Sequence, residues 1–229
     1  MDESVNRSAV AVAVDGFGAF LADLRERESP LTALVVLAIF AVFGVQALTA
    51  SRLDAPIGVV TASVFVERPA VAWVLSPFLH RDVGHLLANV VVVAFVGRVI
   101  ERRFVPRDYV AFLLAAAVVA GLGGYLSKAA FTPAPVTAYG ASGVAYAIAG
   151  YALGLPFADR EVSVVALEPE RLLAQTTATE RVAAAFGVAA VATVLADVAT
   201  GPYLALDWLN GAHLAGLLVG VWTAFAHRR

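Results

Sequence analysis

Two side chains of this sequence have the types needed for a nucleophile and its base. Ser142 stands at the start of one apolar run, two residues after Gly140, and His213 stands at the start of another. A serine hydroxyl becomes a nucleophile when a neighbouring base takes its proton, and histidine is the side chain that most often does so. If the two runs are adjacent helices, the sequence predicts acyl-transfer chemistry at Ser142.

Further polar residues accompany this pair. His85 and Asn89 are four residues apart, so on a helix they project from one face as hydrogen-bond donors. Tyr146 follows Ser142 by one helical turn on the same face. A helix that begins near Ser142 would also aim free backbone N–H groups at a developing oxyanion. Such polar groups are costly within apolar spans, so we interpret them as functional.

Composition indicates what surrounds these residues. The 229-residue chain is 60% hydrophobic and only 15% charged, and its mean hydropathy is +0.81, whereas soluble domains are roughly 45–50% apolar and about 25% charged. Membrane lipid is therefore expected to cover much of the surface. A net charge of -2 offers no basic excess for nucleic acid. The absence of cysteine excludes thiolate chemistry, and without an H-E-x-x-H motif we expect neither metal nor cofactor.

Apolar runs of membrane length predict an all-α, polytopic membrane protein with six transmembrane helices. The runs cover residues 31–48, 83–100, 109–126, 140–155, 182–199 and 211–226, of which the fourth and sixth are short. In the sixth run, Gly216 and Gly220 form a GxxxG row that lets a neighbouring helix approach closely. The membrane domain is thus expected over residues 30–227.

The placement of basic residues predicts the orientation. Twelve of the sixteen Lys and Arg residues fall on one side of the six spans, so that side, with both termini, is expected to be cytoplasmic. Residues 1–29 then form a cytoplasmic segment, in which 9–24 is either an interfacial helix or a mobile leader, and 228–229 form a cytoplasmic tail. The opening MDESVNRS lacks the features of a signal peptide.

The candidate site residues are expected at one depth. Counting toward the expected cytoplasmic ends of their spans, His85, Ser142 and His213 lie sixteen, seventeen and fifteen residues before Glu101, Asp159 and Arg228. At 1.5 Å per residue these separations are roughly 22–26 Å. The three side chains therefore meet somewhat below the outer face of a core about 30 Å thick.

Two outer connections carry further expectations. Residues 51–82 mix polar and apolar side chains, so we expect an amphipathic loop lying in the membrane interface. Asp197 and Asp207 fall near the outer turn between the fifth and sixth spans. We expect solvent to cover them, because they lie too close to the surface for a buried aspartyl pair.

The order of these motifs resembles that of the rhomboid intramembrane serine proteases. The resemblance covers about residues 31–225 and therefore implies a six-helix rhomboid-like bundle. One departure is Trp73-Val74, where family members often carry Trp-Arg in the first outer loop. The matching motifs are His80-x4-His85-x3-Asn89, Gly97-x3-Glu101, Gly140-Ala141-Ser142-Gly143 with Tyr146, and Ala212-His213-x2-Gly216-x3-Gly220.

By position, the resemblance implies a role for each residue. Ser142 would be the nucleophile and His213 its general base, a dyad without an acidic third member. His85 and Asn89, with the Ser142 N–H, would stabilise the oxyanion, and the Tyr146 ring would support the catalytic histidine. The remaining matches would support the site or the bundle: Gly140, Gly143, His80, Glu101, Gly216 and Gly220.

The function implied is endoproteolysis of transmembrane helices in other membrane proteins. The expected location is a prokaryotic cell membrane. The alternative is a non-catalytic rhomboid-like protein that binds membrane helices, although such relatives usually lack the serine or histidine. A small-solute channel is a third hypothesis, and it predicts flux without proteolysis.

Overall fold

The computed structural model describes residues 28–131, 138–158, 176–199 and 210–227, with Gly18 and Ala22. Within these ranges the chain is helical and has no strand, which confirms the all-α prediction. Most of the expected N-terminal segment and the tail 228–229 lie outside the described residues.

Each expected span coincides with a helix. Four of them (α2, α5, α6 and α9) are long and apolar enough to cross a membrane, whereas α7 and α10, with 17 and 16 residues, are apolar but shorter. By length and composition, the described chain therefore supports four of the six expected spans. The two shorter helices, α7 and α10, correspond to the two expected runs that are short in the sequence. The helices are α2 (Pro30–Leu53), α5 (Val83–Glu101), α6 (Pro106–Phe131), α7 (Ser142–Ala158), α9 (Ala178–Ala199) and α10 (Gly211–Ala226).

The expectation of a loop over residues 51–82 is wrong. This segment folds into α3 (Ile57–Glu67), α4 (Pro69–Leu75) and the 3₁₀ turn η1 (Ser76–Phe78). Its apolar residues supply helix faces that pack: Trp73 makes edge contacts with Phe65 and Tyr125, at ring-centroid distances of 6.2 and 5.6 Å. These aromatic contacts anchor the segment to α6.

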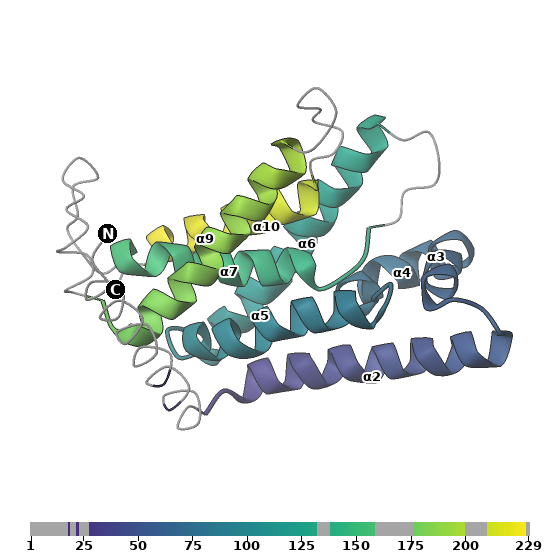
Figure 1. Ribbon diagram of the computed structural model, residues 1–229, viewed down its shortest axis with the longest axis horizontal. Helices are drawn as coiled ribbons and strands as arrows, with labels where there is room; N and C mark the ends of the chain where they lie inside the picture. The colour runs from purple at the N-terminus through teal and green to yellow at the C-terminus, as the bar shows by residue number, and fades with distance from the viewer. Residues whose placement is uncertain are drawn as a thin grey trace, which may run out of the picture.

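Helix α7 lies in the middle of the bundle, with α5 on one side and α9 and α10 on the other (Figure 1). Its core residues Ala147, Ile148 and Ala152 are fully buried. By contrast, α2 lies at the edge, where Leu34 and Leu37 are 63% and 65% exposed. Large apolar side chains exposed on the periphery are what a lipid environment requires.

Glycines bring the backbones of α7 and α10 into contact. A Cβ on Gly216 would collide with the carbonyl oxygen of Gly143, and one on Gly220 would collide with that of Ala147. Close approach through small residues is a main source of helix association in membranes. This contact fixes the start of α7 against the start of α10.

At the other end of the bundle, Glu101 joins α5 to α2. Its buried carboxylate accepts hydrogen bonds from the backbone N–H groups of Leu31 (3.0 Å) and Thr32 (2.8 Å). A carboxylate at this position satisfies two N–H groups that lack partners within the helix and interacts favourably with its dipole. Glu101 thus lies far from the serine and stabilises the bundle.

The close contact of Gly220 with the backbone of α7 leads to a prediction about stability. We expect Gly220→Ala to lower the free energy of unfolding by about 1–3 kcal/mol, because the added methyl group has to displace backbone atoms. The matched change Gly44→Ala, where a Cβ meets nothing within 4 Å, should be neutral or stabilising by up to about 1 kcal/mol. Thermal denaturation in detergent micelles compares them, and equal effects of the two changes would contradict the account.

Candidate active site

A tight turn precedes Ser142. Gly140 has φ = 118°, a conformation that side-chain-bearing residues rarely adopt. A Cβ there would also lie 2.6 Å from the His85 ring. The Gly140 N–H donates to the carbonyl of Ser76 in η1 (2.8 Å). Helix α7 then begins at Ser142, so the serine lies where backbone N–H groups lack partners within the helix.

The His80 side chain holds this turn through a hydrogen bond. Its Nδ1–H donates to the carbonyl of Phe78 (3.0 Å), so Nε2 is free to accept from the N–H of Ala141 (3.4 Å). The side chain is fully buried, and desolvation lowers its pKa from 6.5 to about 4. The neutral ring therefore links the first outer segment to the residue before Ser142.

Gln46, which the sequence prediction missed, holds His80 in turn. The Gln46 side chain accepts from the backbone N–H of His80 and donates to its carbonyl, both at 3.1 Å. Its Nε2 also donates to the hydroxyl of Thr61 (2.5 Å). A glutamine within an apolar span was the available signal, because an amide there requires partners.

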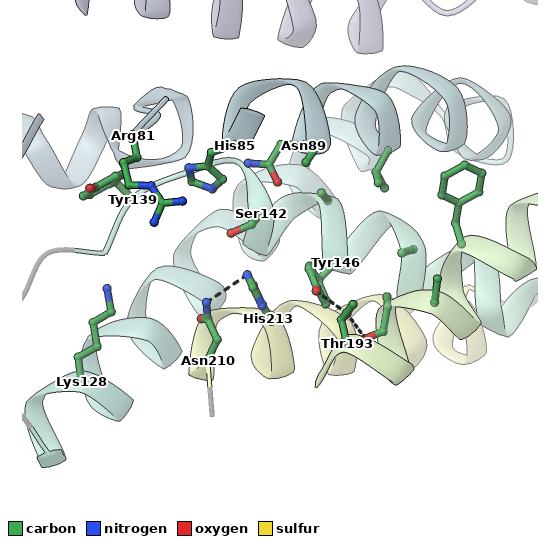
Figure 2. Close-up of a pocket in the computed structure, with 17 residues that line it drawn as sticks. Arg81, His85, Asn89, Lys128, Tyr139, Ser142, Tyr146, Thr193, Asn210 and His213 are labelled. Atoms are coloured by element: carbon green, nitrogen blue, oxygen red, sulfur yellow. Dashed lines mark hydrogen bonds between the residues drawn. The ribbon is translucent and has the colours of Figure 1, made fainter. Parts of the chain in front are cut away.

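A cavity of about 520 Å³ brings five predicted residues together. Figure 2 shows His85 and Asn89 projecting from α5 on one side, Ser142 in the middle, and Tyr146 and His213 on the other side. Gly140 and Gly143 adjoin Ser142 in a smaller neighbouring cavity of about 60 Å³. His80, Glu101, Gly216 and Gly220 lie outside the 520 Å³ cavity. Its other lining residues are Arg81, Ala88, Val92, Lys128, Tyr139, Ala145, Ala149, Phe186, Ala189, Ala190, Thr193 and Asn210.

The α5 side of the cavity carries nitrogen groups without partners. Asn89 Nδ2 and His85 Nδ1 are buried and have no hydrogen-bond partner among the described residues. Asp82 caps α5 by accepting from the backbone N–H of His85 (2.8 Å). A hydrogen bond from Arg81 (2.8 Å) lowers the pKa of the Asp82 carboxyl, so this cap is anionic. An unpartnered buried amide is costly, and here it lines the cavity beside Ser142.

Three contacts hold the His213 ring. Tyr146 stacks on it, with ring centroids 4.1 Å apart and planes within 3°. Tyr146 in turn shares a 2.6 Å hydrogen bond with the hydroxyl of Thr193. Asn210 Nδ2 lies 3.1 Å from His213 Nε2 (Figure 2). The sequence prediction missed Asn210, although an asparagine directly before a helix is a frequent N-cap.

Asp197 makes the third of these contacts and bears on the expectation that solvent covers it. It lies in the last turn of α9, and its Oδ2 is buried 3.5 Å from His213 Nδ1. Solvent therefore covers Asp197 only in part: 33% of its side chain is exposed, whereas Oδ2 is buried toward the histidine. The carboxylate is carried inward because Asp197 follows Thr193 by one turn, on the α9 face that packs against Tyr146. Asp207 lies outside the described residues.

No group of three His, Cys, Asp or Glu side chains capable of holding a metal occurs in the part of the chain that the structure describes. The five predicted side chains that meet in the cavity are a hydroxyl, two imidazoles, an amide and a phenol. Together they offer a nucleophile, a base and hydrogen-bond donors.

Comparison with known proteins assigns the family. The family model of the Rhomboid domain matches residues 67–229. The chain belongs to the rhomboid family. Relatives named "Rhomboid protease GlpG" from Salmonella paratyphi A (strain ATCC 9150 / SARB42), Salmonella typhi and Salmonella newport (strain SL254) are each 27% identical over 219 residues. Each match covers 90% of this chain and 66% of the relative, so the chain spans somewhat less than two thirds of their length.

This membership and the apolar helices establish an integral membrane protein. The resemblance stated from the four motifs is thereby confirmed at the level of the family. The matched region begins at Glu67 and includes every site residue named from the sequence, from His80 to Gly220.

The burial of His80 predicts a pH dependence of stability. In the folded protein its pKa lies near 4, below the unfolded value of 6.5, so between these values the unfolded chain binds more protons. The contribution of His80 to folding is thus lost as the pH falls from about 6.5 toward 4. We expect His80→Gln to flatten the melting temperature against pH over this range. A difference between the two proteins that does not change with pH would contradict this assignment.

Proposed function

We propose that this rhomboid-family chain is a serine endopeptidase that cleaves transmembrane helices of other membrane proteins. The relatives named as rhomboid proteases support a peptidase. The observation that carries the proposal is the position of Ser142, at the free N-terminus of α7, between the α5 donors and His213 (Figure 2). This arrangement provides the three parts that acyl transfer needs.

The mechanism follows from the positions of the nitrogen atoms. The hydrogen bond from Asn210 Nδ2 to His213 Nε2 first has to break, so that Nε2 can take the proton of the Ser142 hydroxyl. The Ser142 Oγ then attacks the scissile carbonyl carbon. His85, Asn89 and the Ser142 N–H stabilise the oxyanion. The protonated imidazole then donates to the leaving amine as the C–N bond breaks. Water attacks the acyl-enzyme with His213 again as base, and this releases the carboxylate product.

The proposed substrate is a helix in the same membrane, because the site opens within an apolar bundle. A helix hydrogen-bonds its own carbonyl groups, so its peptide bonds must unwind locally before Ser142 can attack. Water has to reach the cavity from the outer side, and Arg81, Lys128 and Tyr139 give that cavity polar lining. We propose both termini on the cytoplasmic side, with lipid covering the exposed faces of α2 and α6.

The dyad predicts a loss of activity on either substitution. We expect Ser142→Ala and His213→Ala to reduce cleavage of a single-span reporter protein in liposomes by at least about 10³-fold, because each removes a reacting atom. Ser63→Ala, which alters a serine on α3 whose hydroxyl donates to the Val60 carbonyl in the same helix, is the matched control and should cleave normally. Persistent cleavage by either dyad variant would refute the assignment.

The oxyanion role predicts a different kinetic signature. We expect Asn89→Ala to lower kcat by about 10²-fold with little change in KM, since the amide donor acts on charge that develops in the transition state. Steady-state cleavage in liposomes separates the two constants. If KM rises while kcat is unchanged, Asn89 binds the substrate and does not stabilise the oxyanion.

A further inference from the structure

We propose that Asp197 is a positioning residue that, together with Asn210, holds His213 in the tautomer required of a general base. The inference rests on the proposed function and deepens it, because it adds an acidic partner to a pair that the family resemblance describes as a dyad. The feature that carries it is the 3.5 Å approach of Asp197 Oδ2 to His213 Nδ1.

The tautomer of His213 can be derived from Asn210. The Asn210 Oδ1 accepts from the backbone N–H of Ala212 (3.1 Å), which orients the amide so that its NH₂ group faces the histidine. Nδ2 lies 3.1 Å from His213 Nε2 and can only donate. Nε2 is therefore the acceptor, and a neutral imidazole then carries its hydrogen on Nδ1. This tautomer is the one that presents a lone pair on Nε2 to a serine hydroxyl.

Asp197 is the acceptor that Nδ1–H faces. Both atoms are buried, and neither has a hydrogen-bond partner among the described residues, so each would otherwise be left unsatisfied. Their separation of 3.5 Å exceeds an ordinary hydrogen bond. Contacts between catalytic groups are often long before substrate binds and tighten as charge develops. A carboxylate beside Nδ1 also stabilises the imidazolium that forms when Ser142 loses its proton.

Its negative charge distinguishes Asp197 from the other titratable groups near the His213 ring. The titratable groups that line the same cavity from other helices are Tyr146 on α7, His85 on α5 and Lys128 on α6. None of them is an anion at neutral pH. Asp197 on α9 thus supplies negative charge next to the base, and the stacking on Tyr146 restricts rotation of the ring about its Cβ–Cγ bond.

Helix α9 therefore holds the base in two ways. Thr193 and Asp197 are four residues apart on one face. Thr193 binds the hydroxyl of Tyr146, whose ring stacks on the imidazole, and Asp197 approaches Nδ1 at the edge of the same ring. A displacement of α9 would loosen both contacts together.

The test compares Asp197→Asn with Asp197→Glu in the liposome cleavage assay. We expect the asparagine variant to lose at least about tenfold in kcat with KM within about twofold, because an amide lacks the negative charge that stabilises the imidazolium formed during reaction. Glutamate should recover part of this loss, since it restores the carboxylate and the side chain at this position is 33% exposed. Asp54→Asn is the matched control, because asparagine also tolerates the left-handed backbone of Asp54 (φ 48°).

A second measurement does not depend on the Asp197 variants folding. Nitrogen NMR of ¹⁵N-histidine-labelled protein in micelles, with the His213 signal assigned through His213→Gln, reports the tautomer directly. We expect Nδ1 to carry the hydrogen. A hydrogen on Nε2 would overturn the inference about Asp197 and leave the proposed function standing. The same conclusion would follow if Asp197→Asn kept an unchanged kcat while Ser142→Ala was inactive. Cleavage by Ser142→Ala would instead overturn the proposed function.

Discussion

The site depends on the backbone contact between α7 and α10. Gly216 leaves no space for a side chain where α10 meets the backbone of Gly143, and Gly220 repeats the contact one turn further along α10. The contact places the first residue of α7 beside the first turn of α10. Since Ser142 and His213 occupy those two positions, packing alone brings a hydroxyl and an imidazole into one cavity.

The remaining contacts orient what this packing brings together. On one side, Gln46 and His80 hold the turn before Ser142 through a chain of buried hydrogen bonds. On the other side, α9 reaches His213 through Thr193, Tyr146 and Asp197. The base is thus held by side chains from three helices, α7, α9 and α10. Preorganised groups of this kind need little rearrangement during reaction.

The sequence predicts the helices well because lipid makes hydropathy a direct signal. The six expected runs each coincide with a helix, and Ser142, His213, His85 and Asn89 stand out because polar residues are rare in such runs. The helices of 51–82 were missed because a mixed pattern does not separate an interfacial helix from a loop. The contact of Asp197 with His213 was missed because it depends on how α9 is rotated against α7 and α10. That rotation is set by packing between helices, which a pattern along one helix does not contain.

The central claim is that Ser142 is a nucleophile activated by His213. The most direct measurement is mass spectrometry of the folded protein in micelles after reaction with a fluorophosphonate probe, which bonds to activated serines. The account predicts a single phosphonylated peptide containing Ser142, and its loss in a His213→Ala protein of unchanged melting temperature. An unmodified Ser142 in the folded protein, or equal labelling without His213, would contradict it.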